Sequence, residues 1–230
     1  MKMEQISEHI WSVSSLVGLI LPIHVWLVVD SGGVTLVDTG MSYMGDGIMK
    51  FVKGLQAGPL NQILLTHGHS DHVGSVTKIV QKTSVPVYAH RIELPYMNGE
   101  QLYPRRKKLE HNIPKGLAQP LTGKDDVDLD LVADLKPYLA PGHSPGHVVY
   151  YHEQDSVLLA GDLFTSKNGR LRRPMPMFTG DMAEALRSAA IVKRLNPARV
   201  EVCHGKSVIR PAEQVDEYVA ATAQSFSLLV

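Results

Sequence analysis

Short apolar runs separated by turn residues make up the first third of the chain. Three of these runs cover residues 10–17, 24–30 and 33–38, and Ser31-Gly32-Gly33 separates the second run from the third. Apolar, β-branched runs bounded by glycine and serine predict strands joined by turns. A helix is expected to follow at about residues 44–55.

The rest of the chain continues with alternating strand and helix patterns. Further strands are expected at 62–66, 85–89, 135–140, 148–153, 156–160 and 199–203, and helices at about 73–81, 182–195 and 211–225. Asp181 is suited to cap the helix that follows it, and Pro211 fits a first helical turn. Two strand-rich stretches that each end in helices predict an α/β (α+β) fold with two packed sheets and helices outside.

Residues 91–120 interrupt this regular pattern with a polar segment that contains several prolines. Long irregular connections in compact domains usually carry a function. We therefore expect a partly helical insertion near the active site, and whether it forms a lid or a dimer contact stays open. The chain has no repeat and no linker that would divide it, so a single domain over residues 1–230 is expected.

Composition excludes several classes of partner. The chain has 230 residues, is 44% hydrophobic, and has 23 basic and 23 acidic residues, giving a net charge of zero. This balance argues against nucleic acid or an anionic membrane as a partner. The one basic stretch, residues 105–108, is interpreted as a solvated helix face or loop.

The single cysteine, Cys203, permits no internal disulfide, which agrees with a cytoplasmic location. The N-terminus carries no signal-peptide pattern. The apolar stretch at residues 13–29 contains Pro22 and His24, and it is interpreted as two strands rather than a membrane span.

The strongest chemical signal follows the strand expected at 62–66. Three imidazoles and one carboxylate fall within six residues: His67, His69, Asp71 and His72. Metal sites need several donors in one small volume, and a loop at a strand end can supply them. The segment therefore predicts a metal site.

The second half of the chain supplies further donors, each after an apolar strand. His143 and His147 follow one strand, Asp162 follows the next, and His204 follows the strand at 199–203. Strand ends that carry donors in this way are expected to deliver their side chains to one common edge of the fold.

Taken together, these motifs resemble the metallo-β-lactamase superfamily of hydrolases, in its glyoxalase II and lactonase-like branch. The resemblance rests on HxHxDH at 67–72, on His147 in Gly-His-Ser-Pro-Gly-His, and on Asp162 and His204, while residues 36–40 around Asp38 resemble another family element. It implies the four-layered αββα sandwich of the metallo-β-lactamase fold, with the site at one edge of two facing sheets.

The resemblance also implies two metal ions. One ion would be held by three imidazoles, the other by an aspartate and two imidazoles, and a second aspartate would bridge them: His67, His69 and His147; Asp71, His72 and His204; and Asp162. Two Zn²⁺ ions suit these donors, with manganese, iron or cobalt as alternatives. His143 and Asp38 are expected to support the ligands without touching a metal.

The implied activity is hydrolysis. A hydroxide shared by the two ions would attack a small ester, lactone, thioester or related acyl compound, and Asp71 is the expected catalytic residue. Two alternatives remain: a mononuclear iron enzyme like the sulfur dioxygenases, and a phosphotriester or phosphodiester hydrolase. Thr165 stands where family lactonases carry a tyrosine, which weakens a lactonase assignment.

Apolar loops near the expected site predict a pocket for a small, fairly apolar molecule. The candidate lining residues are Leu21, Ile23, His24, Tyr96, Met97, Thr165, Met177 and Phe178. Core packing or a homodimer contact is the alternative explanation for these apolar segments.

Overall fold

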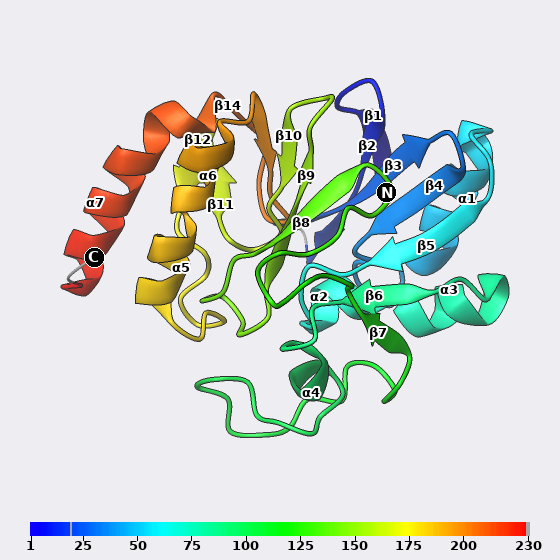
Figure 1. Cartoon of the computed structure of the whole chain (residues 1–230), viewed down its shortest axis with the longest axis horizontal. Helices are drawn as coiled ribbons and strands as arrows, with labels where there is room; N and C mark the ends of the chain where they lie inside the picture. The colour runs from blue at the N-terminus through cyan, green and yellow to red at the C-terminus, as the bar shows by residue number, and fades with distance from the viewer. Residues whose placement is uncertain (19, 229–230) are drawn as a thin grey trace.

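Two β-sheets face each other in the computed structural model, which describes residues 1–18 and 20–228 (Figure 1). The first sheet has seven strands in chain order, antiparallel from β1 to β4 and parallel from β4 to β7. Its strands are β1 (Lys2–Gln5), β2 (Ile10–Val17), β3 (Leu21–Asp30), β4 (Gly33–Val37), β5 (Leu60–Leu64), β6 (Val87–Ala89) and β7 (Ala118–Pro120).

The second sheet has five strands in the order β14-β13-β10-β9-β8, and only β10 and β13 run parallel. They are β8 (Leu135–Leu139), β9 (Val148–His152), β10 (Val157–Leu159), β13 (Arg199–Glu201) and β14 (Val208–Ile209). A separate hairpin consists of β11 (Thr165–Lys167) and β12 (Arg170–Arg172).

Helices cover the outer faces of both sheets, which completes the predicted four-layered αββα sandwich (Figure 1). α1 (Gly45–Leu55) and α3 (Val76–Thr83) lie on the first sheet. α5 (Met182–Ser188), α6 (Ala190–Leu195), the 3₁₀ turn η1 (Pro211–Gln214) and α7 (Val215–Phe226) lie on the second. The short helices α2 (Ser70–Val73) and α4 (Leu94–Met97) lie in loops below the first sheet.

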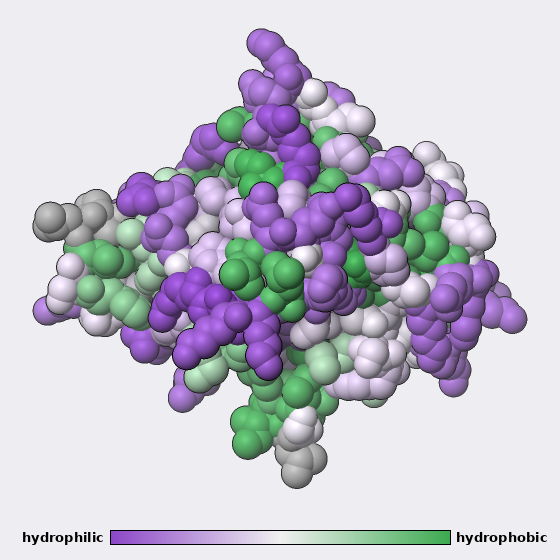
Figure 2. All heavy atoms as spheres, turned by 90° about the horizontal axis from the view of Figure 1, so that it is seen from below, coloured by the Kyte–Doolittle hydropathy of each residue, from purple (hydrophilic) through white to green (hydrophobic). Residues whose placement is uncertain are grey.

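Hydrophobic side chains form two clusters that correspond to these layers. The larger cluster includes residues of both sheets, such as Trp26 and Tyr150, and residues of α1, such as Ile48. The smaller one joins the second sheet to its helices through residues such as Phe164 and Tyr218. On the outside, hydrophobic patches lie among hydrophilic side chains on the face seen from below (Figure 2).

Two predicted helices are each split in the structure. The one expected at 73–81 is divided between α2 and α3, and Gly74, which lies between them, approaches the carbonyl oxygens of Ser70 and Gly40 too closely for a side chain. The one expected at 182–195 divides at Ala189 into α5 and α6. Strands β1, β7, β11, β12 and β14 were not predicted, since they have two to four residues and lack apolar runs. No helix in the described part of the chain is long and apolar enough to span a membrane.

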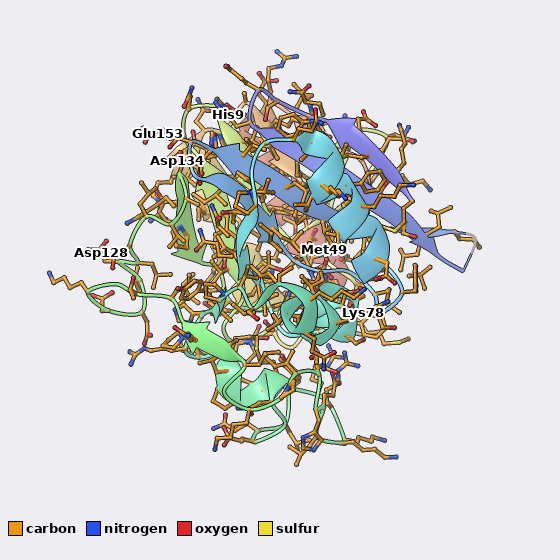
Figure 3. The ribbon with its side chains drawn as sticks, turned by 90° about the vertical axis from the view of Figure 1, so that its right-hand side faces the viewer. His9, Met49, Lys78, Asp128, Asp134 and Glu153 are labelled. Carbon is orange, nitrogen blue, oxygen red and sulfur yellow. The ribbon has the colours of Figure 1, made fainter. Side chains whose placement is uncertain are left out.

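His9 connects the turn before β2 to the turn after β9. Its Nδ1 lies 2.7 Å from Asp155 Oδ1, its ring stacks on His152 at 5.3 Å, and hydrogen bonding to Asp155 raises the pKa of His9. Figure 3 shows His9, Asp134 and Glu153 gathered along this edge. With Asp155, these two histidines form a further cluster of possible metal ligands, away from the sequence motifs.

The two sheets also share a buried polar contact, which makes a testable prediction. The Tyr150 hydroxyl donates to the Leu65 carbonyl at 2.9 Å, and Tyr150 is fully buried. Tyr150→Phe should lower the free energy of unfolding by about 1–2 kcal/mol, because a buried hydrogen bond is lost. Urea denaturation with an unchanged m-value measures this effect.

Tyr151→Phe is the matched control, since the Tyr151 hydroxyl is only half-buried and its partner, Ser156 Oγ, lies 3.5 Å away. It should change the unfolding free energy by less than about 0.5 kcal/mol. Equal losses in the two variants would contradict a special role for the contact between the sheets.

Candidate metal centre

Donor side chains gather where strands of both sheets end. The segment 67–72 follows β5, while Asp162 follows β10 and His204 follows β13. Carboxyl ends of parallel strands commonly form binding sites, because the loops that leave them meet at one edge. Here the edges of the two facing sheets bring these loops together.

The first group of donors is three imidazoles, those of His67, His69 and His143. His67 Nε2 and His143 Nε2 each lie 3.0 Å from His69 Nδ1. All three side chains are buried, and burial lowers the pKa of His67 and His143 and brings that of His69 to about 4. The rings are therefore neutral near pH 7 and can offer lone pairs.

The second group consists of Asp71, His72, Cys203 and His204. His204 Nε2 lies 3.2 Å from Asp71 Oδ2, and His72 Nε2 lies 4.0 Å from the same oxygen. Although burial opposes ionisation, His72 and His204 lower the pKa of Asp71 to about 2. The sequence motifs did not indicate Cys203 as a possible ligand, but its thiol belongs to this group.

Asp162 contacts both groups. Its Oδ2 lies 3.4 Å from His143 Nε2 and 3.4 Å from His204 Nε2, and its Oδ1 lies 3.5 Å from His72 Nε2. Burial disfavours the charge, yet the two imidazoles of the second group hold the pKa of Asp162 well below its usual range. An ionised carboxylate between two donor groups is suited to bridge two cations.

The donor atoms are placed as metal ligands would be, and several of them are not hydrogen-bonded to one another. His72 Nε2, His204 Nε2 and Asp162 Oδ1 are buried and have no hydrogen-bond partner among the described residues. Unpaired buried polar atoms are costly and require an explanation. Two ligands about 2.1 Å from a tetrahedral ion lie roughly 3.4 Å apart. The separations of His204 from Asp71 and of Asp162 from His72 and His204, at 3.2–3.5 Å, are close to this value, while His72 and Asp71 lie 4.0 Å apart.

The structure differs from the expectation for the two histidines of the Gly142–His147 segment. His143, in the loop after β8, lies with His67 and His69, whereas His147 lies in none of the donor groups found among the described residues. Its Nε2 instead accepts a hydrogen bond from the Asp162 backbone N–H at 3.1 Å. His147 directly precedes β9, and this hydrogen bond supports the turn that carries Asp162. Its Nδ1 is buried and has no hydrogen-bond partner among the described residues.

Asp38 lies beside the second donor group, at the end of β4. Its Oδ2 is 2.7 Å from His72 Nδ1, and its two oxygens also accept hydrogen bonds from the N–H and hydroxyl of Thr66. A carboxylate on the remote nitrogen of an imidazole fixes the ring and its tautomer. This contact leaves His72 Nε2 directed at Asp162.

Sequence patterns missed Glu93, a fully buried carboxylate in the insertion. It accepts four hydrogen bonds: from Gly68 N–H at 3.0 Å, Tyr103 hydroxyl at 2.8 Å, Ser144 hydroxyl at 2.9 Å and Gly146 N–H at 2.8 Å. Burial raises the pKa of Glu93, and these donors oppose that rise. The carboxylate thus joins the loop of His67 and His69 to the loop of His143.

Two glycines permit this close approach. A Cβ on Gly146 would lie 2.4 Å from the Glu93 backbone nitrogen, and one on Gly68 would lie 2.3 Å from the Tyr103 hydroxyl oxygen. Only glycine fits where backbone segments come this close. The glycines in the two histidine motifs therefore indicate that a third segment packs against both loops.

A pocket of about 180 Å³ opens beside the donors. Three of the candidate residues named from the sequence, Leu21, Ile23 and Phe178, line it, and Val17, Met41 and Met175 add to the apolar wall. The other predicted residues lie elsewhere: Met97 is in the core, Met177 is largely exposed, Tyr96 packs on Tyr103, and His24 and Thr165 line other pockets.

Two charged residues of the insertion also line this pocket, Arg106 and Glu110. Their side chains lie 3.3 Å apart, and the Arg106 guanidinium stacks over the Phe178 ring at 5.0 Å. Arg106 belongs to the basic stretch that the sequence suggests is a solvated face. In the structure its charge is half-buried at the pocket wall.

Comparison with known proteins shows the family of this chain. Residues 19–204 match the metallo-beta-lactamase superfamily. The chain is 38% identical over 221 residues to the Bacillus subtilis protein named probable metallo-hydrolase YybB, covering 95% of this chain and 98% of that protein. It is 32% identical over 169 residues to a hydroxyacylglutathione hydrolase of Methylobacillus flagellatus, covering 73% of this chain and 56% of that protein.

Solved structures share the fold at low sequence identity. The metallo-beta-lactamase FIM-1 of Pseudomonas aeruginosa, in its mono-zinc form, matches with a TM-score of 0.79 at 18% identity, covering 99% of this chain and 96% of that one. A metallo beta lactamase of Erythrobacter litoralis matches with a TM-score of 0.75 at 18% identity, covering 95% and 96%. At this identity the likeness concerns the fold alone.

The role of Glu93 can be tested by Glu93→Gln. Gly68 N–H and Gly146 N–H bind different oxygens of Glu93, so the amide nitrogen of glutamine must face one fixed N–H donor. We expect the free energy of unfolding to fall by about 1–3 kcal/mol and metal affinity to fall by about 10–100-fold. Urea denaturation and competition with a chelating dye measure the two effects.

Tyr103→Phe is the control, since it removes one of the four donors and leaves both backbone contacts intact. It should lower metal affinity by less than about tenfold. If Glu93→Gln retained the metal affinity of the unaltered protein, Glu93 would have no part in positioning the two histidine loops.

Proposed function

The chain belongs to the metallo-beta-lactamase superfamily, and on that premise we propose that it is a binuclear zinc hydrolase of small acyl compounds that carry a carboxylate. The observation that carries this proposal is the pair of donor groups joined by Asp162. His67, His69 and His143 would hold one ion, and Asp71, His72 and His204 the other, with Asp162 between them.

Zinc is supported by the chemistry of the donors. Imidazole nitrogens and carboxylate oxygens are ordinary zinc ligands, and thiolate sulfur favours zinc over magnesium, calcium or manganese. Cys203 lies within 4.8 Å of the other donor atoms of the second group. A buried thiol beside two imidazoles and a carboxylate therefore supports zinc at the second position.

The residues around the site divide the work of hydrolysis. Two bound divalent ions would supply a nucleophile from water near neutral pH and would polarise the substrate carbonyl. Asp71 faces the pocket with a side chain that is 27% exposed, and its ionised carboxylate would accept a hydrogen bond from the attacking water. Asp38 and Glu93 keep the histidines in place.

The pocket supports a substrate with both an apolar and an anionic part. Val17, Leu21 and Ile23 face the pocket and suit a small hydrocarbon group. Arg106 offers a guanidinium that matches a carboxylate. Together with the similarity to a protein named hydroxyacylglutathione hydrolase, this supports an ester, thioester or lactone of a small acid.

Metal quantification tests the proposal and the ligand set together. The purified protein should hold two zinc ions per chain and should lose hydrolysis of esters, thioesters or lactones when a chelator removes them. His143→Gln should hold fewer than two ions, whereas His147→Gln should still reach two at excess zinc, because His147 Nε2 bonds a backbone N–H.

Three outcomes would overturn parts of this assignment. One iron per chain would favour a mononuclear iron enzyme of the sulfur-dioxygenase kind. Turnover of phosphotriesters or phosphodiesters alone would exclude acyl substrates. Full metal loading in His143→Gln, with a loss in His147→Gln, would restore His147 as the ligand.

The substrate class makes a separate prediction for Arg106. Arg106→Gln should raise KM about tenfold or more for an ester with a free carboxylate, because a charged hydrogen bond is lost. KM should stay unchanged for a second ester in which a neutral amide replaces the free carboxylate. Steady-state kinetics on this pair of substrates measures the difference.

Lys108→Gln is the matched control, since Lys108 is exposed and belongs to the same basic stretch. It removes the same charge without altering the pocket lining, and it should leave both KM values unchanged. An equal KM rise in the two variants would assign the effect to the general charge of the loop.

A further inference from the structure

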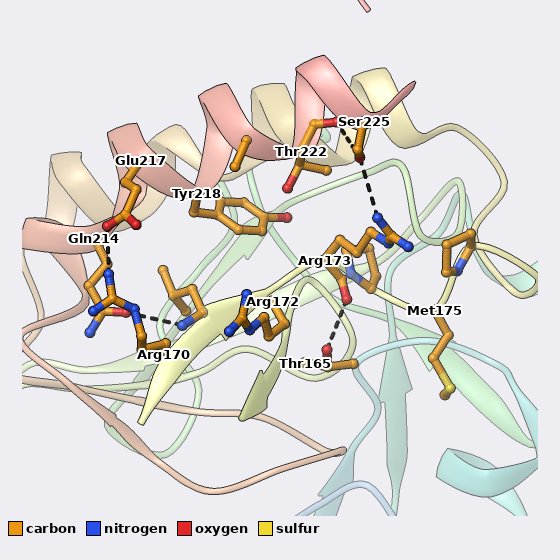
Figure 4. A pocket seen from close by; sticks show the side chains of 14 residues that line it. Thr165, Arg170, Arg172, Arg173, Met175, Gln214, Glu217, Tyr218, Thr222 and Ser225 are labelled. Carbon is orange, nitrogen blue, oxygen red and sulfur yellow. Dashed lines mark hydrogen bonds and ion pairs between the residues drawn. The ribbon is translucent and has the colours of Figure 1, made fainter. Parts of the chain in front are cut away.

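A second pocket, of about 520 Å³, lies away from the donor groups, between the hairpin β11–β12 and helix α7 (Figure 4). Strand β12 and the segment after it form one wall, and one face of α7 forms the other. Figure 4 shows Tyr218, Thr222 and Ser225 projecting from α7 toward β12, which ends at Arg172, and the segment after it, which begins with Arg173. These residues belong neither to the donor groups nor to the lining of the pocket beside them.

Positive charge dominates this pocket. Three arginines and one acidic residue, Glu217, line it. Arg170 forms an ion pair with Glu217 at 2.6 Å. Among the described residues, Arg172 and Arg173 have no acidic partner. Arg173 instead donates to the Ser225 hydroxyl at 3.3 Å and stacks on the Phe226 ring at 5.1 Å.

A buried hydroxyl adds an unsatisfied donor at the same place. Tyr218 is 6% exposed, and its hydroxyl has no hydrogen-bond partner within the described chain. Its ring is held against Phe164 at 5.2 Å, and burial raises the pKa of Tyr218, so the hydroxyl keeps its proton at neutral pH. Arg173 lines the same pocket, and Figure 4 shows the hydroxyl end of Tyr218 turned toward the side where Arg173 lies.

The remaining lining gives the pocket an apolar side. Leu171, Pro174 and Ala221 contribute carbon surface, and Met175 borders both this pocket and the pocket beside the donor groups. A ligand with a charged head and a short carbon body would match both kinds of surface.

We propose that this pocket is a binding site for a small phosphate-bearing molecule, separate from the metal centre. Arg172 and Arg173 would pair with the phosphate oxygens, and Tyr218 would donate a further hydrogen bond once Arg173 turns toward the ligand. Two guanidinium groups without acidic partners carry two positive charges, which a phosphate dianion balances and a single carboxylate does not, and the phosphate oxygens can also accept from the hydroxyl.

Calorimetric titration of the metal-loaded protein with inorganic pyrophosphate tests the site. The double variant R172Q/R173Q should bind at least about tenfold more weakly, because two charged hydrogen-bonding groups are lost. Tyr218→Phe should weaken binding by about three- to tenfold and leave the fold intact, since it removes only an unpaired hydroxyl.

The controls separate this site from general charge and from the metal centre. Arg187→Gln removes an exposed arginine that pairs with Glu184 on α5, outside the pocket, and should leave the affinity unchanged. Pyrophosphate bound at the metal centre would appear as a second event that a chelator abolishes and the pocket variants do not alter. Unchanged affinity in R172Q/R173Q, or an equal loss in Arg187→Gln, would overturn the proposal.

Discussion

The buried carboxylate of Glu93 is the contact on which the geometry of the first donor group depends. Its oxygens bind the backbone of Gly68, between His67 and His69, and the backbone of Gly146, in the loop that carries His143. A charge buried this deeply is tolerated only when hydrogen bonds satisfy it. Once the two loops supply those hydrogen bonds, neither can shift without leaving a buried charge partly unpaired.

Asp38 has a similar role for the second group, but it acts through one ring rather than two loops. It follows β4, next to β5 in the first sheet, and holds His72 through Nδ1. Its backbone has a φ of 59°, a conformation that residues other than glycine rarely adopt. The backbone is thus strained at Asp38, where the side chain fixes the orientation of the His72 ring.

The sequence predicted the two facing sheets, most of their strands and the clustering of donors at strand ends, because apolar runs and metal motifs are local patterns. It could not distinguish His143 from His147, since both lie in one short segment and only the packing of β9 decides which ring reaches His69. The roles of Glu93 and Arg106 could not be predicted from the sequence for the same reason. Their roles come from contacts across the chain, and nothing in their immediate neighbours distinguishes them from surface residues.

The insertion is also attached to the opposite wall of the pocket beside the donor groups. The Arg105 guanidinium donates to the carbonyl oxygens of Pro176 and Thr179, in the segment that supplies Met175 and Phe178. These two walls come from parts of the chain far apart in sequence, and Arg105 and Arg106 of the insertion both contact the opposite wall. Exchanging either loop alone between relatives would change the width of the pocket as well as its chemistry.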